Sequence, residues 1–260
     1  MRIPLYQIDA FTSRVFGGNP AAVCPLDAWL PDATMQSIGR ENNLSETAFI
    51  VPRGDDYEIR WFTPACEVDL CGHATLASGY AVFHILDPSR TSVSFSSKSG
   101  PLNVKRQDDT IVMDFPARPA SQIDPPRGLL DALNVKPAAV FKAVDYMAVF
   151  ERESDVRALR PDMAKLAELN SVRAFICTAP GDEVDFVSRF FAPKQGVPED
   201  PVTGSAHCTL IPYWSKRLGR NPLRALQLSA RGGEIFCEDL GDRVGIAGKA
   251  ALYLEGAIHV

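Results

Sequence analysis

Hydrophobic and polar residues alternate along several short stretches of the chain. The alternation covers residues 57–63, 93–96 and 110–115, and it is typical of strands with one buried face. Residues 74–86 are different, because they are apolar on nearly every side of a helix. A helix of this kind is buried all round rather than laid on a surface. We therefore expect strands that wrap around a central helix.

The second half of the chain repeats a pattern of the first half, at an offset of about 130 residues. Residues 60–64 (RWFTP) correspond to residues 189–193 (RFFAP). Each segment is followed by an acidic stretch, a glycine and an apolar run, at residues 69–76 and 201–208. Chance does not readily produce several matches in the same order. We interpret the chain as a duplicated fold with a pseudo-twofold axis.

The two halves predict an α/β (α+β) fold with two pseudo-symmetric lobes, each a mixed, curled β-sheet or barrel around a central buried helix. The first lobe covers residues 1–118 and the second residues 119–260, with the active site in the cleft between them. Four prolines punctuate a polar stretch at residues 116–126, where we place the boundary. A C-terminal strand over residues 250–260 is a candidate to complete the first lobe.

Other helices are expected beside the central one. Residues 34–43 and 161–170 have the pattern of short surface helices. Residues 205–218 are the counterpart of the central helix in the second half. This segment contains Pro212, which lacks a backbone N–H and is expected to kink the helix.

The net charge, the N-terminal sequence and the length of the most apolar segment limit the partners of the protein. The 260-residue chain has a formal net charge of −5, whereas a nucleic-acid partner requires a concentrated basic face. The N-terminus has no apolar signal core, and the most apolar helix is too short to span a bilayer. We therefore expect a cytoplasmic protein with no nucleic-acid partner and no membrane contact.

Six scattered cysteines fit a reducing compartment. Cys66 and Cys71 lie near His73 and could contribute to a metal site, but no second cluster has the spacing of metal ligands. We expect no metal. A nucleotide cofactor is also not expected, because no strand leads into a Gly-x-Gly-x-x-Gly loop or a P-loop.

In both halves a glycine and a small polar or histidine residue stand where the buried helix begins. These pairs are Gly72 with His73 and Gly204 with Ser205. Free N–H groups and the positive end of the helix dipole make such a terminus an anion receptor. It could hold a substrate carboxylate and stabilise an enolate-like intermediate. The alternative is that the glycines only cap or turn the chain, but two copies in register favour binding.

Glu46 is the candidate proton carrier, because it stands between a polar helix end and an apolar strand. A carboxylate next to an apolar wall can have a raised pKa, which suits general acid–base catalysis. The alternative is a solvated glutamate at the start of a strand. Asp200 could be a base, a substrate clamp or a turn residue. His73 could be an acid–base partner or a helix-start residue with a satisfied imidazole.

Four ordered motifs carry a family resemblance. They lie at residues 19–23 (NPAAV), 45–49 (SETAF), 71–75 (CGHAT) and 200–207 (DPVTGSAH). They resemble those of the PhzF-like isomerases of phenazine biosynthesis, a family similar in fold to diaminopimelate epimerase. The resemblance implies a homodimer, no cofactor and proton transfer at a carbon acid. In the phenazine enzyme, trans-2,3-dihydro-3-hydroxyanthranilate is isomerised to a ketone.

The same resemblance implies roles for individual residues. Glu46 matches the general acid–base glutamate of the family. Gly72 and His73 match the first substrate-binding loop of the family. The second loop is matched by Asp200, Gly204 and Ser205. His73 and Asp200 are implied to orient the substrate or to assist the movement of the proton.

One departure separates the chain from the epimerase relatives, which use two facing cysteines, one before each helix-start glycine. Cys71 holds the first of these places, but Thr203 holds the second. A threonine hydroxyl is too weak an acid and base to replace a thiol. We therefore do not expect racemisation by two cysteines.

Three hypotheses follow. The first, which we favour, is an isomerase that moves a proton on a small cyclic amino or hydroxy acid through Glu46. The second is an amino-acid epimerase or racemase that uses Cys71 or Glu46. The third is a non-catalytic protein that binds small acids.

Overall fold

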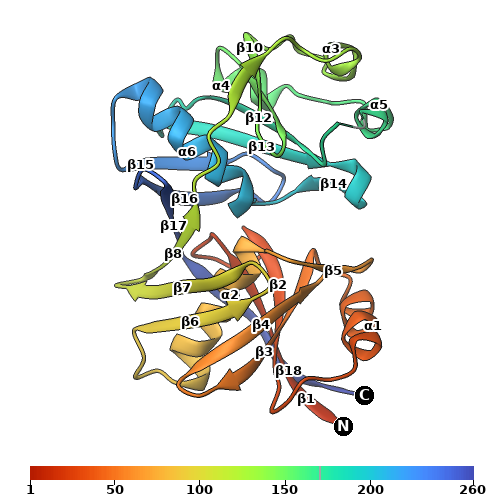
Figure 1. Cartoon of the computed structure of the whole chain (residues 1–260), viewed down its shortest axis with the longest axis vertical. Helices are drawn as coiled ribbons and strands as arrows, with labels where there is room; N and C mark the ends of the chain where they lie inside the picture. Colours follow the sequence, from red (N-terminus) through yellow and green to blue (C-terminus); the bar gives the residue numbers. More distant parts are fainter. Residues whose placement is uncertain (170) are drawn as a thin grey trace. The chain divides into compact units, whose positions relative to one another are not determined.

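The computed structural model describes residues 1–169 and 171–260, which form two compact units (Figure 1). Unit 1 comprises Met1–Phe115 and Ile246–Val260, and unit 2 comprises Pro116–Gly245. The C-terminal segment therefore packs with the N-terminal half of the chain. Within unit 1 its long strand pairs antiparallel with the first strand, from Arg2 opposite His259 to Ala10 opposite Ala250.

Unit 1 is built mainly of strands around one central helix. The strands are β1 (Arg2–Ala10), β2 (Asn19–Pro25), β3 (Glu46–Arg53), β4 (Asp56–Phe62), β5 (Glu67–Val68), β6 (Ser92–Ser97), β7 (Gly100–Gln107), β8 (Thr110–Pro116) and β18 (Ala250–His259). The helices are α1 (Asp32–Asn42) and α2 (Gly72–Ala81), and α2 continues into a π-helical turn, η1 (Val82–Leu86).

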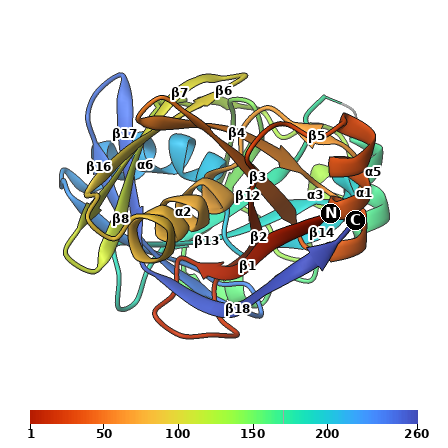
Figure 2. The same cartoon turned by 90° about the horizontal axis from the view of Figure 1, so that it is seen from below.

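Helix α2 is the buried centre of unit 1 (Figure 2). Every residue of α2 except Tyr80 is buried, and the helix contacts β1, β2, β3, β7 and β18. Its buried Ser78 hydroxyl donates a hydrogen bond to the Ala74 carbonyl, so this polar group costs little to bury. Gly79 allows close packing, because a Cβ there would lie 2.8 Å from Val104 Cγ1. The strand-wrapped helix expected from the sequence is thus present.

Unit 2 has more irregular structure. Its strands are β9 (Ser121–Ile123), β10 (Ala139–Lys142), β11 (Tyr146–Val149), β12 (Phe175–Pro180), β13 (Phe186–Ala192), β14 (Val197–Asp200), β15 (Leu223–Gln227), β16 (Gly233–Asp239) and the first half of β17 (Arg243–Gly248). Its helices are α3 (Leu129–Ala132), α4 (Glu153–Arg157), α5 (Met163–Glu168), the 3-10 turn η2 (Pro193–Gln195) and α6 (Gly204–Leu218).

The two units share one pattern of strand pairing, which confirms the duplicated fold. In unit 1, β1–β2 is antiparallel, β2–β3 parallel, β3–β4 antiparallel and β4–β6 parallel. In unit 2, β10–β11, β11–β12, β12–β13 and β13–β15 have the same senses in the same order. In each unit the central helix lies between the fourth and fifth strands of the series and follows a short extra strand, as α2 follows β5 and α6 follows β14.

Helix α6 contains Pro212, and the structure shows how the chain accommodates it. The α-helix runs without interruption from Gly204 to Leu218. Proline cannot donate to the carbonyl four residues earlier, which belongs to Cys208. That carbonyl instead accepts a hydrogen bond from the Arg118 N–H at 2.8 Å. The hydrogen bond lost to proline is therefore replaced from outside the helix.

The other expected helices differ from the observed ones mainly at their ends. The surface helix expected at residues 34–43 is α1, which begins two residues earlier. The one expected at 161–170 is α5, and its expected end at Asn170 lies outside the described residues. In the described part of the chain no helix has both the length and the apolar character needed to cross a bilayer.

Candidate active site

Glu46 is positioned by the turn between α1 and β3. Asn43 caps the C-terminal end of α1 in the left-handed conformation, with φ of 50°, and the strand begins three residues later. The Asn42 amide donates to the Thr47 hydroxyl at 3.0 Å and ties the helix end to the strand start. Glu46 is the first residue of β3, and only 18% of its side chain is exposed.

His73 meets Glu46 at the start of the central helix. Cys71 is the N-cap of α2 and has extended geometry, so Gly72 and His73 are the first two helical residues. The His73 side chain is almost fully buried, and its Nε2 lies 3.1 Å from Glu46 Oε2. The two atoms are at hydrogen-bonding distance but are not aligned for a hydrogen bond. Such loose geometry is common in active sites without substrate.

The imidazole of His73 is neutral. Burial lowers its pKa to about 3, because the charged form would have to leave water. The nearby Glu46 carboxylate favours the charged form, but burial is the larger effect. The other ring nitrogen, Nδ1, lies 3.2 Å from Asn19 Nδ2 and 3.6 Å from Cys71 Sγ. Glu46, Cys71 and His73 therefore surround one buried helix start.

These three residues are also of the types that bind transition metals. One ligand atom from each lies within 4.8 Å of the others. However, Cys71 approaches Nδ1 of His73, whereas Glu46 approaches Nε2. A metal ion binds one of the two ring nitrogens, so the present arrangement does not direct all three ligands at one point. Sequence spacing indicated Cys66, Cys71 and His73 and omitted Glu46, whereas this group contains Glu46 and not Cys66.

The second group of expected residues lies at the start of α6 in unit 2. Asp200 ends β14, Thr203 is the N-cap, and Gly204 and Ser205 are the first helical residues. The Thr203 hydroxyl donates to Asp200 Oδ2 at 2.5 Å. The carboxylate is thus held beside the helix start, and the hydroxyl is engaged with it rather than poised for proton transfer.

Two polar residues that support this helix start were missed by the sequence analysis. Gln227 accepts from the Thr203 N–H at 2.9 Å and donates to the Asp200 carbonyl at 2.8 Å. The sequence does contain a signal for Gln227, because it is a polar residue on the buried face of an alternating strand. Arg173 donates to the Ser205 hydroxyl at 3.0 Å and forms a bidentate ion pair with the buried Asp145. No local pattern identifies that pair.

His207, the last residue of the fourth motif, has a structural environment. It is fully buried, and its Nδ1 lies 2.8 Å from the Thr203 carbonyl. Since a carbonyl only accepts, Nδ1 must carry the proton. Burial lowers the pKa of His207 to about 4, so it is also neutral.

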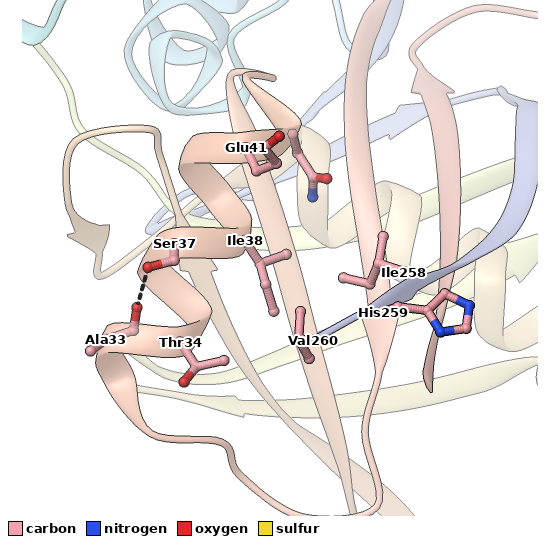
Figure 3. Close-up of a pocket in the computed structure, with 9 residues that line it drawn as sticks. Ala33, Thr34, Ser37, Ile38, Glu41, Ile258, His259 and Val260 are labelled. Atoms are coloured by element: carbon pink, nitrogen blue, oxygen red, sulfur yellow. Dashed lines mark hydrogen bonds between the residues drawn. The ribbon is translucent and has the colours of Figure 1, made fainter. Parts of the chain in front are cut away.

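Unit 1 also contains a pocket of about 650 Å³ between α1 and the end of β18 (Figure 3). Its lining includes Ser37 and Glu41 from the helix and Ile258 and His259 from the strand. None of the site residues expected from the sequence lines it. The pocket is therefore separate from the Glu46–His73 pair.

Comparison with known proteins identifies the relatives of this chain. The family model described as phenazine biosynthesis-like protein (PhzC-PhzF) matches residues 8–256. An uncharacterized isomerase of Pseudomonas aeruginosa is 51% identical over 260 residues, which cover 100% of both chains. The crystal structure of a PhzF-family phenazine biosynthesis protein from Enterococcus faecalis has a TM-score of 0.97 and 45% identity, with 100% of both chains covered.

A more distant structure extends the likeness in fold. A predicted epimerase of Pseudomonas aeruginosa has a TM-score of 0.76 and 18% identity, with 99% of each chain covered. These likenesses define the class of protein: the chain is an isomerase with the fold shared by PhzF proteins and epimerase-like proteins. More particularly, it belongs to the phenazine biosynthesis-like family. The family resemblance of the four sequence motifs is thereby confirmed.

Proposed function

We propose that the protein moves a proton on a small cyclic amino or hydroxy acid, with Glu46 as general acid and base. The reaction would be similar to that of trans-2,3-dihydro-3-hydroxyanthranilate isomerase. The contact between Glu46 Oε2 and His73 Nε2 carries this proposal, because it places a partly exposed carboxylate beside a neutral imidazole. No cofactor takes part, and the enzyme is a cytoplasmic homodimer.

The start of α2 supplies the anion receptor. The first hydrogen bond of the helix runs from the Thr75 N–H to the Cys71 carbonyl at 3.3 Å. The N–H groups of Gly72, His73 and Ala74 precede it and have no partner within the helix. They favour a substrate carboxylate or the oxygen of an enolate, which develops negative charge as the proton leaves carbon. Gly204 and Ser205 offer the same chemistry at the start of α6.

The proton moves in two steps. Ionised Glu46 removes a proton from the carbon acid, and the electron pair of the broken C–H bond delocalises into an enolate or dienolate. Protonated Glu46 then returns the proton to a second carbon on the same face. His73 and Asp200 orient the substrate or assist the proton movement, and the total number of protons is unchanged.

Isotope exchange tests the proposal. Candidate cyclic amino and hydroxy acids are incubated with the enzyme in deuterium oxide, and NMR follows the loss of C–H signals. We expect exchange by the native enzyme and a loss of about 100-fold or more in Glu46→Gln. Glu41→Gln is the matched control, because Glu41 lies on the exposed end of α1. Equal exchange by the native and Glu46→Gln enzymes would remove Glu46 from the mechanism.

The contact between Cys71 Sγ and His73 Nδ1 favours a second candidate, an epimerase in which Cys71 is an additional acid or base. Chiral chromatography separates the two. Inversion of a stereocentre that disappears in Cys71→Ser supports epimerisation. Isomerisation without inversion, retained in Cys71→Ser, supports the first candidate.

A further inference from the structure

We propose that Asn19 is a positioning residue that keeps the single ring proton of His73 on Nε2, facing Glu46. Glu46 is thereby held in its ionised, proton-accepting form. This inference rests on the proposed role of Glu46 and adds a residue 54 positions from His73 in the sequence.

The hydrogen-bonding capacity of the neighbours determines which ring nitrogen carries the proton. Asn19 Nδ2 lies 3.2 Å from His73 Nδ1, and an amide nitrogen can only donate. Cys71 Sγ lies 3.6 Å from the same nitrogen, and a thiol can donate to it weakly. Nδ1 must therefore offer its lone pair, and in a neutral imidazole the proton then resides on Nε2.

That proton lies beside the catalytic carboxylate. Nε2 lies 3.1 Å from Glu46 Oε2, and although the N–H is not aligned for a hydrogen bond, its partial positive charge at this distance favours the ionised carboxylate. If the Asn19 amide were rotated, its oxygen would face Nδ1 and draw the proton there. Two lone pairs would then face each other between Nε2 and Oε2, and only a protonated Glu46 would relieve them. The orientation of Asn19 and the protonation of Glu46 are thus linked.

The chain before Asn19 is built to fix its position. Asn19 is fully buried and opens β2, opposite Ala10 of β1. Gly18 precedes it with φ of +58°, and a Cβ at Gly18 would lie 2.0 Å from the Ala10 carbonyl oxygen. Only glycine fits this turn, so the backbone delivers Asn19 to His73 in one place.

Nitrogen-15 NMR of the imidazole rings tests the proposal without substrate. The chain has four histidines, and the His73→Asn variant assigns the His73 signals. We expect His73 to show a bare Nδ1 and a protonated Nε2. His207 is an internal reference with the opposite tautomer, because its Nδ1 donates to the Thr203 carbonyl. A protonated Nδ1 on His73 in the native protein would overturn the proposal.

The Asn19→Asp variant tests causation. Its carboxylate accepts rather than donates, so Nδ1 of His73 should gain a proton. Asn103→Asp, the same change at an exposed position of β7, should leave the His73 spectrum unchanged. An unaltered His73 tautomer in a folded Asn19→Asp protein would also overturn the proposal. If Asn19→Asp fails to fold, the tautomer of His73 in the native spectrum still supports or overturns the proposal.

Exchange kinetics complete the test. We expect kcat to fall by about 10- to 100-fold in Asn19→Asp, with KM changed far less; losses of this size are typical when a residue that orients a metal-binding histidine is changed. An unchanged kcat in a variant whose tautomer has shifted would show that the tautomer does not matter to catalysis. The NMR result stands independently of Glu46, so failure of the proposed function and failure of this inference are distinguishable.

Discussion

Arg189 in unit 2 makes two of the contacts that Arg60 makes in unit 1. Arg60 forms a bidentate ion pair with Glu67 through hydrogen bonds of 2.7 and 2.8 Å, and Arg189 forms one with Glu199 through hydrogen bonds of 2.7 and 2.9 Å. We call each of these bidentate pairs a fork. Each guanidinium also lies over the ring of the phenylalanine two residues later. The repeated Arg-x-Phe sequence therefore encodes a repeated joint between neighbouring strands.

Loss of either fork should destabilise the protein. We expect Glu67→Gln and Glu199→Gln each to lower the free energy of unfolding by about 1–2 kcal/mol, because a charged bidentate pair is replaced by a neutral contact. Urea unfolding followed by circular dichroism measures the change. Glu168→Gln, at an exposed position, is the control. If both substitutions change the free energy of unfolding no more than Glu168→Gln does, the forks contribute nothing to stability.

The Glu67 fork also predicts a dependence on pH. The hydrogen bonds from Arg60, aided by Lys98, lower the pKa of Glu67 to about 2 from its ordinary value of 4.5. A lowered carboxylate pKa gives stability that is present above pH 4.5 and is lost as pH falls towards about 2. The difference in unfolding free energy between the native protein and Glu67→Gln should therefore shrink over this range.

The buried histidines predict a second effect of pH. Burial lowers the pKa values of His73 and His207 to about 3 and about 4 from the ordinary value of 6.5. The unfolded chain therefore binds more protons than the folded one below pH 6.5, and stability falls as the pH decreases. Each histidine contributes a slope of up to about 1.4 kcal/mol per pH unit.

Urea unfolding at several pH values between about 4 and 6.5 measures that slope. His73→Asn and His207→Asn should each flatten the curve. A slope that survives both substitutions would assign the effect to other groups.

Close packing at Gly79 of α2 predicts a steric cost. A Cβ at Gly79 would lie 2.8 Å from Val104 Cγ1, so Gly79→Ala should destabilise the protein by about 1–3 kcal/mol. In a Val104→Ala background the added methyl has room, and the cost should be smaller. A double-mutant cycle measures this coupling, and additive costs would contradict the contact.

Gly18 and Gly54 form a matched pair for the turn that delivers Asn19. Their φ values are +58° and +61°, but a Cβ at Gly18 meets the Ala10 carbonyl oxygen, whereas one at Gly54 meets nothing within 4 Å. Gly54→Ala should therefore cost about 1 kcal/mol, from backbone conformation alone. Gly18→Ala should cost more and should also slow isotope exchange. Equal costs in thermal unfolding would mean that the turn relaxes easily.

Local sequence patterns were sufficient to predict the duplicated fold. The all-apolar run at residues 74–86 indicated the buried helix, although its last five residues form a π-helical turn that periodicity does not separate from an α-helix. The kink expected at Pro212 stays a prediction, whereas the helix itself continues through the proline and Arg118 supplies the missing donor. That donor lies about ninety residues away in the chain, beyond the reach of a local pattern.

The candidate site was predictable only in part. Glu46 and His73 stood out by residue type and by their positions at element starts, and the structure brings them together. Asn19 lay inside a recognised motif but received no role, since its contact with His73 arises only when β2 packs on α2. Long-range pairs of this kind depend on strand order and register, which single-sequence patterns do not determine.

The repeated strand order has a consequence for how this protein can change. Both Arg–Glu forks retain the same contacts, whereas the two helix starts have diverged, with Cys71 in one and Thr203 in the other. The joints between strands and the residues at the helix starts are thus separate parts of each repeat. New specificities can be selected at the helix starts of either copy while the strand joints preserve the scaffold.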